Sequence, residues 1–89
     1  MRRLRQTNRF KRDLKKVKRA GLSYDDLEAV VIMLLQDIPL PPHHHDHPLV
    51  GQWSGARDCH IKPDWLLIYQ KVDEELHLLR TGTHADLFG

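Results

Sequence analysis

The sequence predicts a small α+β domain of the order β-α-α-β-β-β, with a helical hairpin on one face of a mostly antiparallel sheet. Three observations lead to this fold class. The first half contains two segments whose apolar residues recur at helical spacing, separated by a glycine. The second half contains three short strand-forming segments with brief turns between them. A chain of 89 residues is also suited to a single domain, residues 1–89, with a modest core.

The N-terminal half is expected to form one strand and the helical hairpin. Residues 2–7 form the strand, and a helix follows from Asn8 to the stop at Gly21. Ser23 caps a second helix, which ends near Gln36. The side chains expected to pack on the sheet are Phe10, Leu14, Val17, Leu27, Val31 and Leu34. Their partners on the inner face of the sheet are expected to be Leu67, Tyr69, Leu76 and Leu78.

Residues 37–55 contain four of the five prolines and four histidines, and they are expected to form an ordered loop without regular structure. Strands are expected at 56–61, 65–72 and 75–81, with a tight turn at 73–74. The run WLLIY at 65–69 is apolar on both faces, which indicates a central strand. The helices cover one side of the sheet, and its other face is expected to be open to a ligand.

Strand alternation sorts the residues of segment 56–61 between the two faces. Cys59 and Ile61 should face the helices, which leaves Asp58 and His60 on the open face. His84 follows a turn after the last strand. The residues expected to converge at one end of the open face are His47, His60, Asp64 and His84. Imidazoles both take and give protons near neutral pH, so this group is suited to general acid–base catalysis.

Charge is distributed very unevenly along the chain. Residues 1–19 contain ten Lys and Arg against one acid, a charge of +9. The remaining residues contain four bases and eleven acids, a charge of −7, and the two parts give the net +2. A dense basic block on a helix is typical of a surface that binds a phosphate backbone. The cations expected to bind such a polyanion are Arg9, Arg12, Lys15, Lys16 and Arg19.

Other classes of protein are excluded by composition. The single cysteine, Cys59, rules out an internal disulfide and a cysteine-based zinc module. The chain has neither the apolar core of a signal peptide nor an apolar run near the ~20 residues of a membrane span. We therefore expect a cytoplasmic protein without a membrane partner.

Three motifs in the second half resemble the YafQ family of toxins in the RelE/ParE superfamily. They are DHPLVGQWSGARDCH at 46–60, PDWLLIY at 63–69 and RTGTHADLFG at 80–89. The residues that match family positions associated with RNA cleavage or message positioning are His47, His60, Asp64, Trp65, His84 and Phe88. The chain departs from the family pattern at His43, His44, His45 and Cys59.

The resemblance implies a RelE-like fold and a ribosome-dependent mRNA endonuclease that cuts codons in the ribosomal A site. It also implies a cognate antitoxin that binds DNA and forms an autoregulatory complex with the toxin. RNA is cut without metal or cofactor when its 2′-hydroxyl attacks the adjacent phosphate, and each proton-transfer partner then contributes ~10²–10⁴ in rate. The four converging residues would move protons, Arg57 or Arg80 would stabilise the phosphate, and Phe88 would stack on a base. Trp65 would either stack on a base or pack in the core at the edge of the sheet. The cations at 9–19 would then grip ribosomal RNA.

Two alternatives remain at this point. The run from His43 to His47 contains imidazoles and a carboxylate that suit Zn²⁺ or Ni²⁺, although adjacent residues rarely point at one centre. A non-enzymatic toxin like ParE would use the same fold. The histidines of the open face argue against that second alternative.

Overall fold

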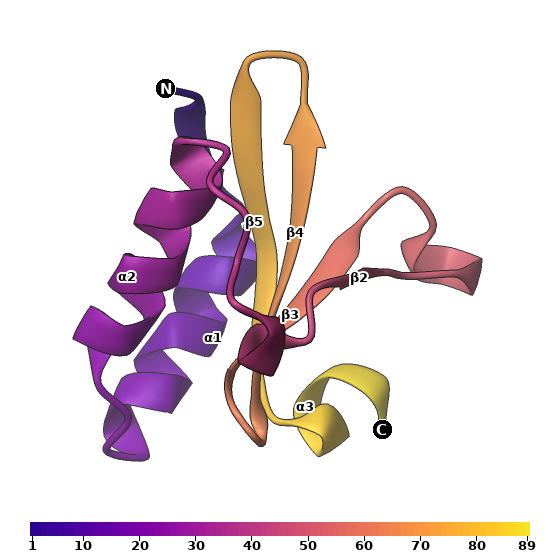
Figure 1. Ribbon diagram of the computed structural model, residues 1–89. Coiled ribbons are helices and arrows are strands. Elements are labelled where there is room, and N and C mark those ends of the chain that lie inside the picture. Colours follow the sequence, from indigo (N-terminus) through magenta and orange to yellow (C-terminus); the bar gives the residue numbers. More distant parts are fainter.

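A five-stranded sheet in the order β1-β5-β4-β3-β2 runs through the middle of the protein (Figure 1). The computed structural model describes residues 1–89. The strands are β1 Arg3–Gln6, β2 His47–Pro48, β3 Arg57–Lys62, β4 Trp65–Val72 and β5 Glu75–Gly82. β1 pairs in parallel with β5, and every other neighbouring pair is antiparallel. The predicted α+β fold is confirmed.

Two helices, α1 (Asn8–Arg19) and α2 (Tyr24–Leu35), form an antiparallel hairpin beside the sheet (Figure 1). The Thr7 hydroxyl accepts a hydrogen bond from the amide of Phe10 at 2.9 Å and so caps α1. The Ser23 hydroxyl caps α2 in the same way. Gly21 joins the two helices with a φ of 86°, a conformation that favours glycine. Both predicted helices are confirmed.

The main core lies between the helical hairpin and the sheet. Every side chain predicted to pack there is buried, apart from Leu14, which is partly buried against the same core. The strand residues of this core include Cys59, Ile61, Leu67 and Leu76, so the predicted inner faces of β3, β4 and β5 are also confirmed. Burying such apolar side chains contributes ~1.5–3 kcal/mol each to stability.

The face of the sheet turned away from the hairpin is only partly open, which corrects the prediction of a free face. A second small core forms there from Ala56, Leu66, Ile68 and Leu87. Leu87 belongs to a C-terminal helix, α3 (His84–Phe88), that sequence periodicity did not reveal. This second core forms because Leu66 and Ile68, within the apolar run at 65–69, lie on the face of β4 that the hairpin does not cover. Their apolar side chains must be shielded from water by another element.

The segment 37–55 is mainly loop, as predicted, but three short elements interrupt it. Two are single 3₁₀ turns, η1 (Pro42–His44) and η2 (Gly51–Trp53). The third is β2, which pairs His47 with Asp58 at the edge of the sheet. Two residues, one of them proline, show no strand periodicity, so the sequence did not predict this strand.

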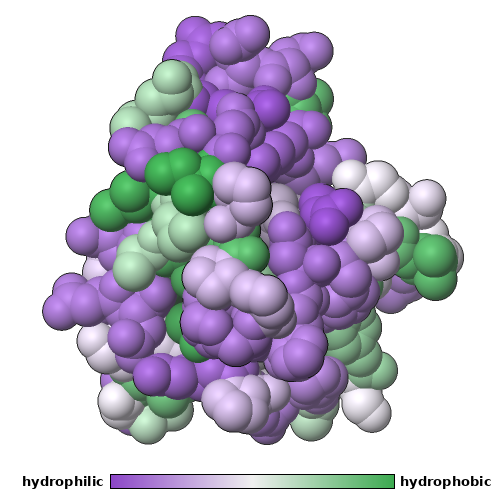
Figure 2. All heavy atoms as spheres, viewed as in Figure 1, coloured by the Kyte–Doolittle hydropathy of each residue, from purple (hydrophilic) through white to green (hydrophobic).

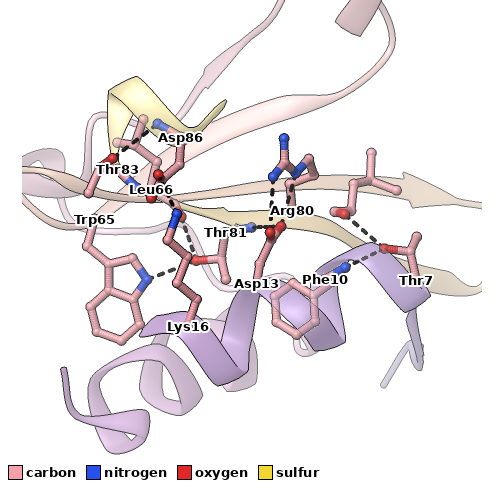
Figure 3. Close-up of polar contacts among 11 residues, drawn as sticks. Thr7, Phe10, Asp13, Lys16, Trp65, Leu66, Arg80, Thr81, Thr83 and Asp86 are labelled. Carbon is pink, nitrogen blue, oxygen red and sulfur yellow. Dashed lines mark hydrogen bonds and ion pairs between the residues drawn. The ribbon is translucent and has the colours of Figure 1, made fainter. Parts of the chain in front are cut away.

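Asp13 of α1 closes an edge of the sheet (Figure 3). β1 ends at Gln6, so β5 has no strand partner on that side beyond Leu78. The Asp13 carboxylate accepts hydrogen bonds from Arg80 at 3.0 Å and from the amide of Thr81 at 3.2 Å. The α1 helix is thereby bound to β5 by charge as well as by apolar packing.

Hydrophilic residues cover most of the molecular face seen in Figure 2, with smaller apolar areas between them. None of the helices has the length and apolar character needed to cross a membrane.

The core position of α2 is testable with a matched pair of substitutions. Leu34 is 2% exposed and Ile32, two residues earlier, is 44% exposed. Leu34→Asp places a charge in the core without a partner and should unfold the domain. Ile32→Asp should change the melting temperature only slightly. Thermal unfolding followed by circular dichroism measures both, and a Leu34→Asp protein that melts like the parent would contradict the assignment.

Candidate active site

His84 and Asp64 form a hydrogen-bonded pair at one end of the sheet. Thr83 and Asp86 cap α3 reciprocally and so orient His84, the first residue of the helix. The Asp64 carboxylate, in the turn before β4, lies 2.8 Å from Nδ1 of His84 and accepts from its backbone amide at 3.1 Å. These two bonds lower the pKa of Asp64. The ionised carboxylate only accepts, so Nδ1 carries a proton and Nε2 is the nitrogen left for proton transfer.

His60 of β3 stands beside this pair. Its ring centroid lies 5.5 Å from that of His84, nearly perpendicular to it, and 5.2 Å from that of His45. Partial burial lowers the pKa of His60, and the nearby imidazoles of His45, His84 and His47 lower it further, while Asp58 opposes them. A neutral imidazole near neutral pH is able to accept a proton.

His47 of β2 belongs to the same cluster because it contacts Asp58, which lies on the same face of β3 as His60. Its Nδ1 lies 2.6 Å from the carbonyl oxygen of His45, and its Nε2 lies 3.7 Å from an oxygen of Asp58. The structure therefore brings His47, His60 and His84 together with Asp64, as the strand alternation indicated. Asp58 is the further member of this group, for which the sequence had suggested only a position on this face.

The extra histidines of this chain line a hollow next to His60. Its volume is about 510 Å³, and its lining consists of His43, His45, His60, Ile61, Lys62 and Pro63. The ring of His44 anchors the loop, because its Nδ1 lies 2.6 Å from the carbonyl oxygen of His60. No group of three or more His, Cys, Asp or Glu side chains is placed to hold a metal ion. The histidine run therefore adds imidazoles to the hollow beside the site.

Trp65 does not have the base-stacking role that was one of the two expected of it. It is 1% exposed, it packs in the main core, and its indole Nε1 donates to the Thr81 hydroxyl at 2.8 Å (Figure 3). A buried ring has no free face for a base, so the prediction that Trp65 stacks on RNA is wrong. Phe88, by contrast, is 47% exposed, and its predicted contact with a base stays a prediction.

The two arginines expected to stabilise the phosphate are engaged elsewhere. Arg57 lies on the same face of β3 as Cys59, away from His60, and its Nε donates to Asp46 at 3.1 Å. Arg80 makes two hydrogen bonds with Asp13 (Figure 3). The prediction for Arg80 is corrected, because its side chain is largely buried against Asp13. The side chain of Arg57 is 41% exposed, and its predicted contact with phosphate stays a prediction.

The cations of α1 are mostly free of partners. Lys16 is bound to Asp86 at 2.9 Å, which ties α1 to α3. Arg9, Arg12, Lys15 and Arg19 are exposed and form no ion pair. Four unpaired charges on one helix are available to a polyanion, and their predicted contact with ribosomal RNA stays a prediction.

The two aromatic residues give a direct test of this assignment. Trp65→Ala removes a buried ring and its hydrogen bond, and it should destabilise the domain by ~3–5 kcal/mol. Phe88→Ala should change the free energy of unfolding by less than ~1 kcal/mol, because half of that ring is already in solvent. Urea unfolding of both variants measures the difference. Equal and small losses would show that Trp65 is not a core residue.

Comparisons with known proteins all point to one family. The family described as "Bacterial toxin of type II toxin-antitoxin system, YafQ" matches residues 2–89. The mRNA interferase toxin YafQ of Escherichia coli K12 is 40% identical over 84 residues, which cover 93% of this chain and 91% of that protein.

Solved structures agree with the sequence match. The structure of the Escherichia coli DinJ-YafQ complex is similar over the whole of both chains, with a TM-score of 0.92 and 39% identity. A copper-bound mutant toxin from Helicobacter pylori has a TM-score of 0.95 and 41% identity, covering 99% of this chain and 100% of that one. The chain belongs to the YafQ family of toxins of type II toxin–antitoxin systems.

Proposed function

We propose that this protein is an mRNA interferase, an endoribonuclease that acts as the toxin of a type II toxin–antitoxin module. The observation that carries the proposal is the His84–Asp64 pair facing His60, with 5.5 Å between the two imidazole rings. Two imidazoles at this separation are suited to act on the two ends of one phosphodiester. The name of the Escherichia coli relative, an mRNA interferase toxin, supports the same activity.

The proposed reaction uses the RNA's own 2′-hydroxyl as the nucleophile. His60, whose pKa is lowered, takes the hydroxyl proton, and the freed oxygen attacks the adjacent phosphorus. The bond from phosphorus to the 5′ oxygen breaks, and His84 gives that oxygen a proton. The products are a 2′,3′-cyclic phosphate and a 5′-hydroxyl. Asp64 stabilises the positive charge of the imidazolium before the proton leaves, which is the role of the orienting acid in catalytic triads.

No step of this mechanism uses a metal ion. Structures of toxins from Helicobacter pylori contain copper or another metal. Here the histidines and carboxylates form no group with the arrangement that a metal ion requires. The proposed chemistry therefore relies on proton transfer between side chains and RNA.

The partners follow from the same proposal. Unpaired cations on α1 suit ribosomal RNA, and we infer that cleavage takes place on mRNA in the ribosomal A site. The substrate places the protein in the cytoplasm. The Escherichia coli relative was solved with DinJ, and we infer that a cognate antitoxin, itself DNA-binding, neutralises this toxin and forms an autoregulatory complex with it. An acidic antitoxin segment would be attracted to the free cations of α1.

The catalytic proposal is tested by removing one imidazole. His84→Ala should lower cleavage by ~10²-fold or more, because it removes a proton-transfer partner, and it should leave ribosome binding intact. His77→Ala is a matched control, because His77 lies on β5 and pairs with Glu75 instead of the site. Transcript 5′ ends, mapped after a brief pulse of expression, report the cleavage.

The same assay includes a chelator. Cleavage should persist in EDTA, since no proposed step uses a metal ion. Full toxicity of His84→Ala, or activity that EDTA abolishes and Zn²⁺ restores, would overturn the mechanism. Altered DNA topology with intact transcripts would instead indicate a non-enzymatic toxin like ParE.

The docking role of α1 is tested by charge reversal. Replacing Arg9, Arg12 and Lys15 with Glu should weaken ribosome association and make it less sensitive to salt. Each lost phosphate contact lowers the salt slope by ~0.7–0.9, so three contacts should lower it by about two to three. His84→Ala keeps these charges and is the control. An unchanged slope in co-sedimentation with ribosomes would place the docking surface elsewhere.

A further inference from the structure

Asp58 is the most deeply buried charged residue of the protein, and none of the reaction steps above uses it. It is 3% exposed, and its Oδ1 is buried without any hydrogen-bond donor. An isolated buried carboxylate is costly, because water no longer stabilises its charge. A group of this kind is retained where the neighbouring charges compensate for it, and the neighbours of Asp58 are the residues of the site.

Imidazoles from three elements surround this carboxyl. Burial is the largest influence on Asp58 and raises its pKa, and Asp46, just before β2, adds to that effect. His47 of β2 lies 3.7 Å from the carboxylate, His60 lies two residues along on the same face of β3, and His84 of α3 lies beside His60. Each of these imidazoles lowers the pKa of Asp58. The neighbouring side chains of β4 on this face are apolar and add no charge.

The contact between His47 and Asp58 requires a proton. The carbonyl of His45 can only accept, so Nδ1 of His47 carries the hydrogen of that bond. Its other nitrogen, Nε2, lies 3.7 Å from Oδ2 of Asp58. An unprotonated nitrogen would set its lone pair against a carboxylate, which is repulsive. The pair therefore holds at least one proton, on the imidazole or on the carboxyl.

We propose that Asp58 is a positioning residue of the site, whose carboxylate is the shared counter-ion of His47, His60 and His84 and keeps a proton on this group of imidazoles. This inference rests on the proposed cleavage reaction, in which one imidazole must be protonated and another neutral. Crowded imidazoles disfavour each other's charged forms, as the neighbours of His60 do. A buried negative charge offsets this repulsion, so the group titrates as a coupled unit that retains an acid.

Asp58→Asn is the direct test, because asparagine keeps the shape of the side chain and removes its charge. The imidazole signals of the cluster are followed by NMR against pH in the parent and in the variant. The pH at which the cluster takes up its first proton should fall by about one unit or more, as expected for the loss of an opposite charge within ~4–6 Å.

Glu75→Gln is the matched control. Glu75 pairs with Arg5 and His77 outside the cluster, so its loss removes a carboxylate and should leave the titration of His60 close to that of the parent. An unchanged His60 titration in folded Asp58→Asn would overturn the proposal. This measurement needs no substrate, so it stands or falls separately from the nuclease activity.

Cleavage adds a second readout. The loss caused by Asp58→Asn should grow with pH, reaching ~10-fold for each unit by which the acid's titration moves. A purely structural effect would lower the rate by the same factor at every pH, and that result would also overturn the proposal.

A measurement on the unaltered protein covers the case in which Asp58→Asn does not fold. The carboxyl carbon of Asp58 is observed by ¹³C NMR across the pH range in which the imidazoles titrate. We expect it to be ionised where the cluster holds a proton, and to change together with the imidazole signals. A carboxyl that remains protonated throughout, from about pH 5 to 8, would contradict its role as a counter-ion.

Discussion

Burial of β4 on both faces is the constraint on which the rest of the structure depends. Five consecutive side chains, residues 65–69, are each no more than 1% exposed. The helical hairpin can cover only one side of the strand, so Leu66 and Ile68 need another cover. Leu87 supplies it, and by docking there α3 carries His84 to within reach of His60. The geometry of the histidine cluster is therefore a consequence of core formation, because the packing of Leu87 fixes the position of His84.

The sequence predicted the elements and faces that depend on local periodicity. The helical hairpin, the three long strands and the outward direction of His60 all follow from spacings of two or of three to four residues. Strand alternation placed only His60 of the histidine cluster; His84 and Asp64 were predicted beside it from the turns in which they lie, and His47 from the loop before β3. Trp65 and Arg80 were misassigned because their partners are Thr81 and Asp13, 16 and 67 residues away, and no local pattern reveals such a contact. The helix α3 was missed because five residues are too few to establish a period.

The lone acid of the basic N-terminal block has a structural explanation. Asp13 is turned inward, where it neutralises Arg80 and satisfies the amide of Thr81 at an edge that β1 does not reach. The neighbouring cations Arg9, Arg12, Lys15 and Arg19 are exposed and form no ion pair, so their charge is available to other partners. The helix α1 therefore has two electrostatic roles. Its one carboxylate, Asp13, binds the sheet on the inward face, and the cations of the outward face remain available to other partners.

The parallel pairing of β1 with β5 has a consequence for the order of events during synthesis. Arg3 lies opposite Glu75, and nearly the whole chain separates the two strands. The first strand made, β1, has no other strand partner and must therefore wait for β5 before it is paired. Contacts of such long sequence separation form late and slowly. A nascent chain has no complete sheet and no assembled histidine cluster until β5 and α3 have been translated. The late position of β5 and α3 in the chain therefore makes the complete histidine cluster one of the last features to form.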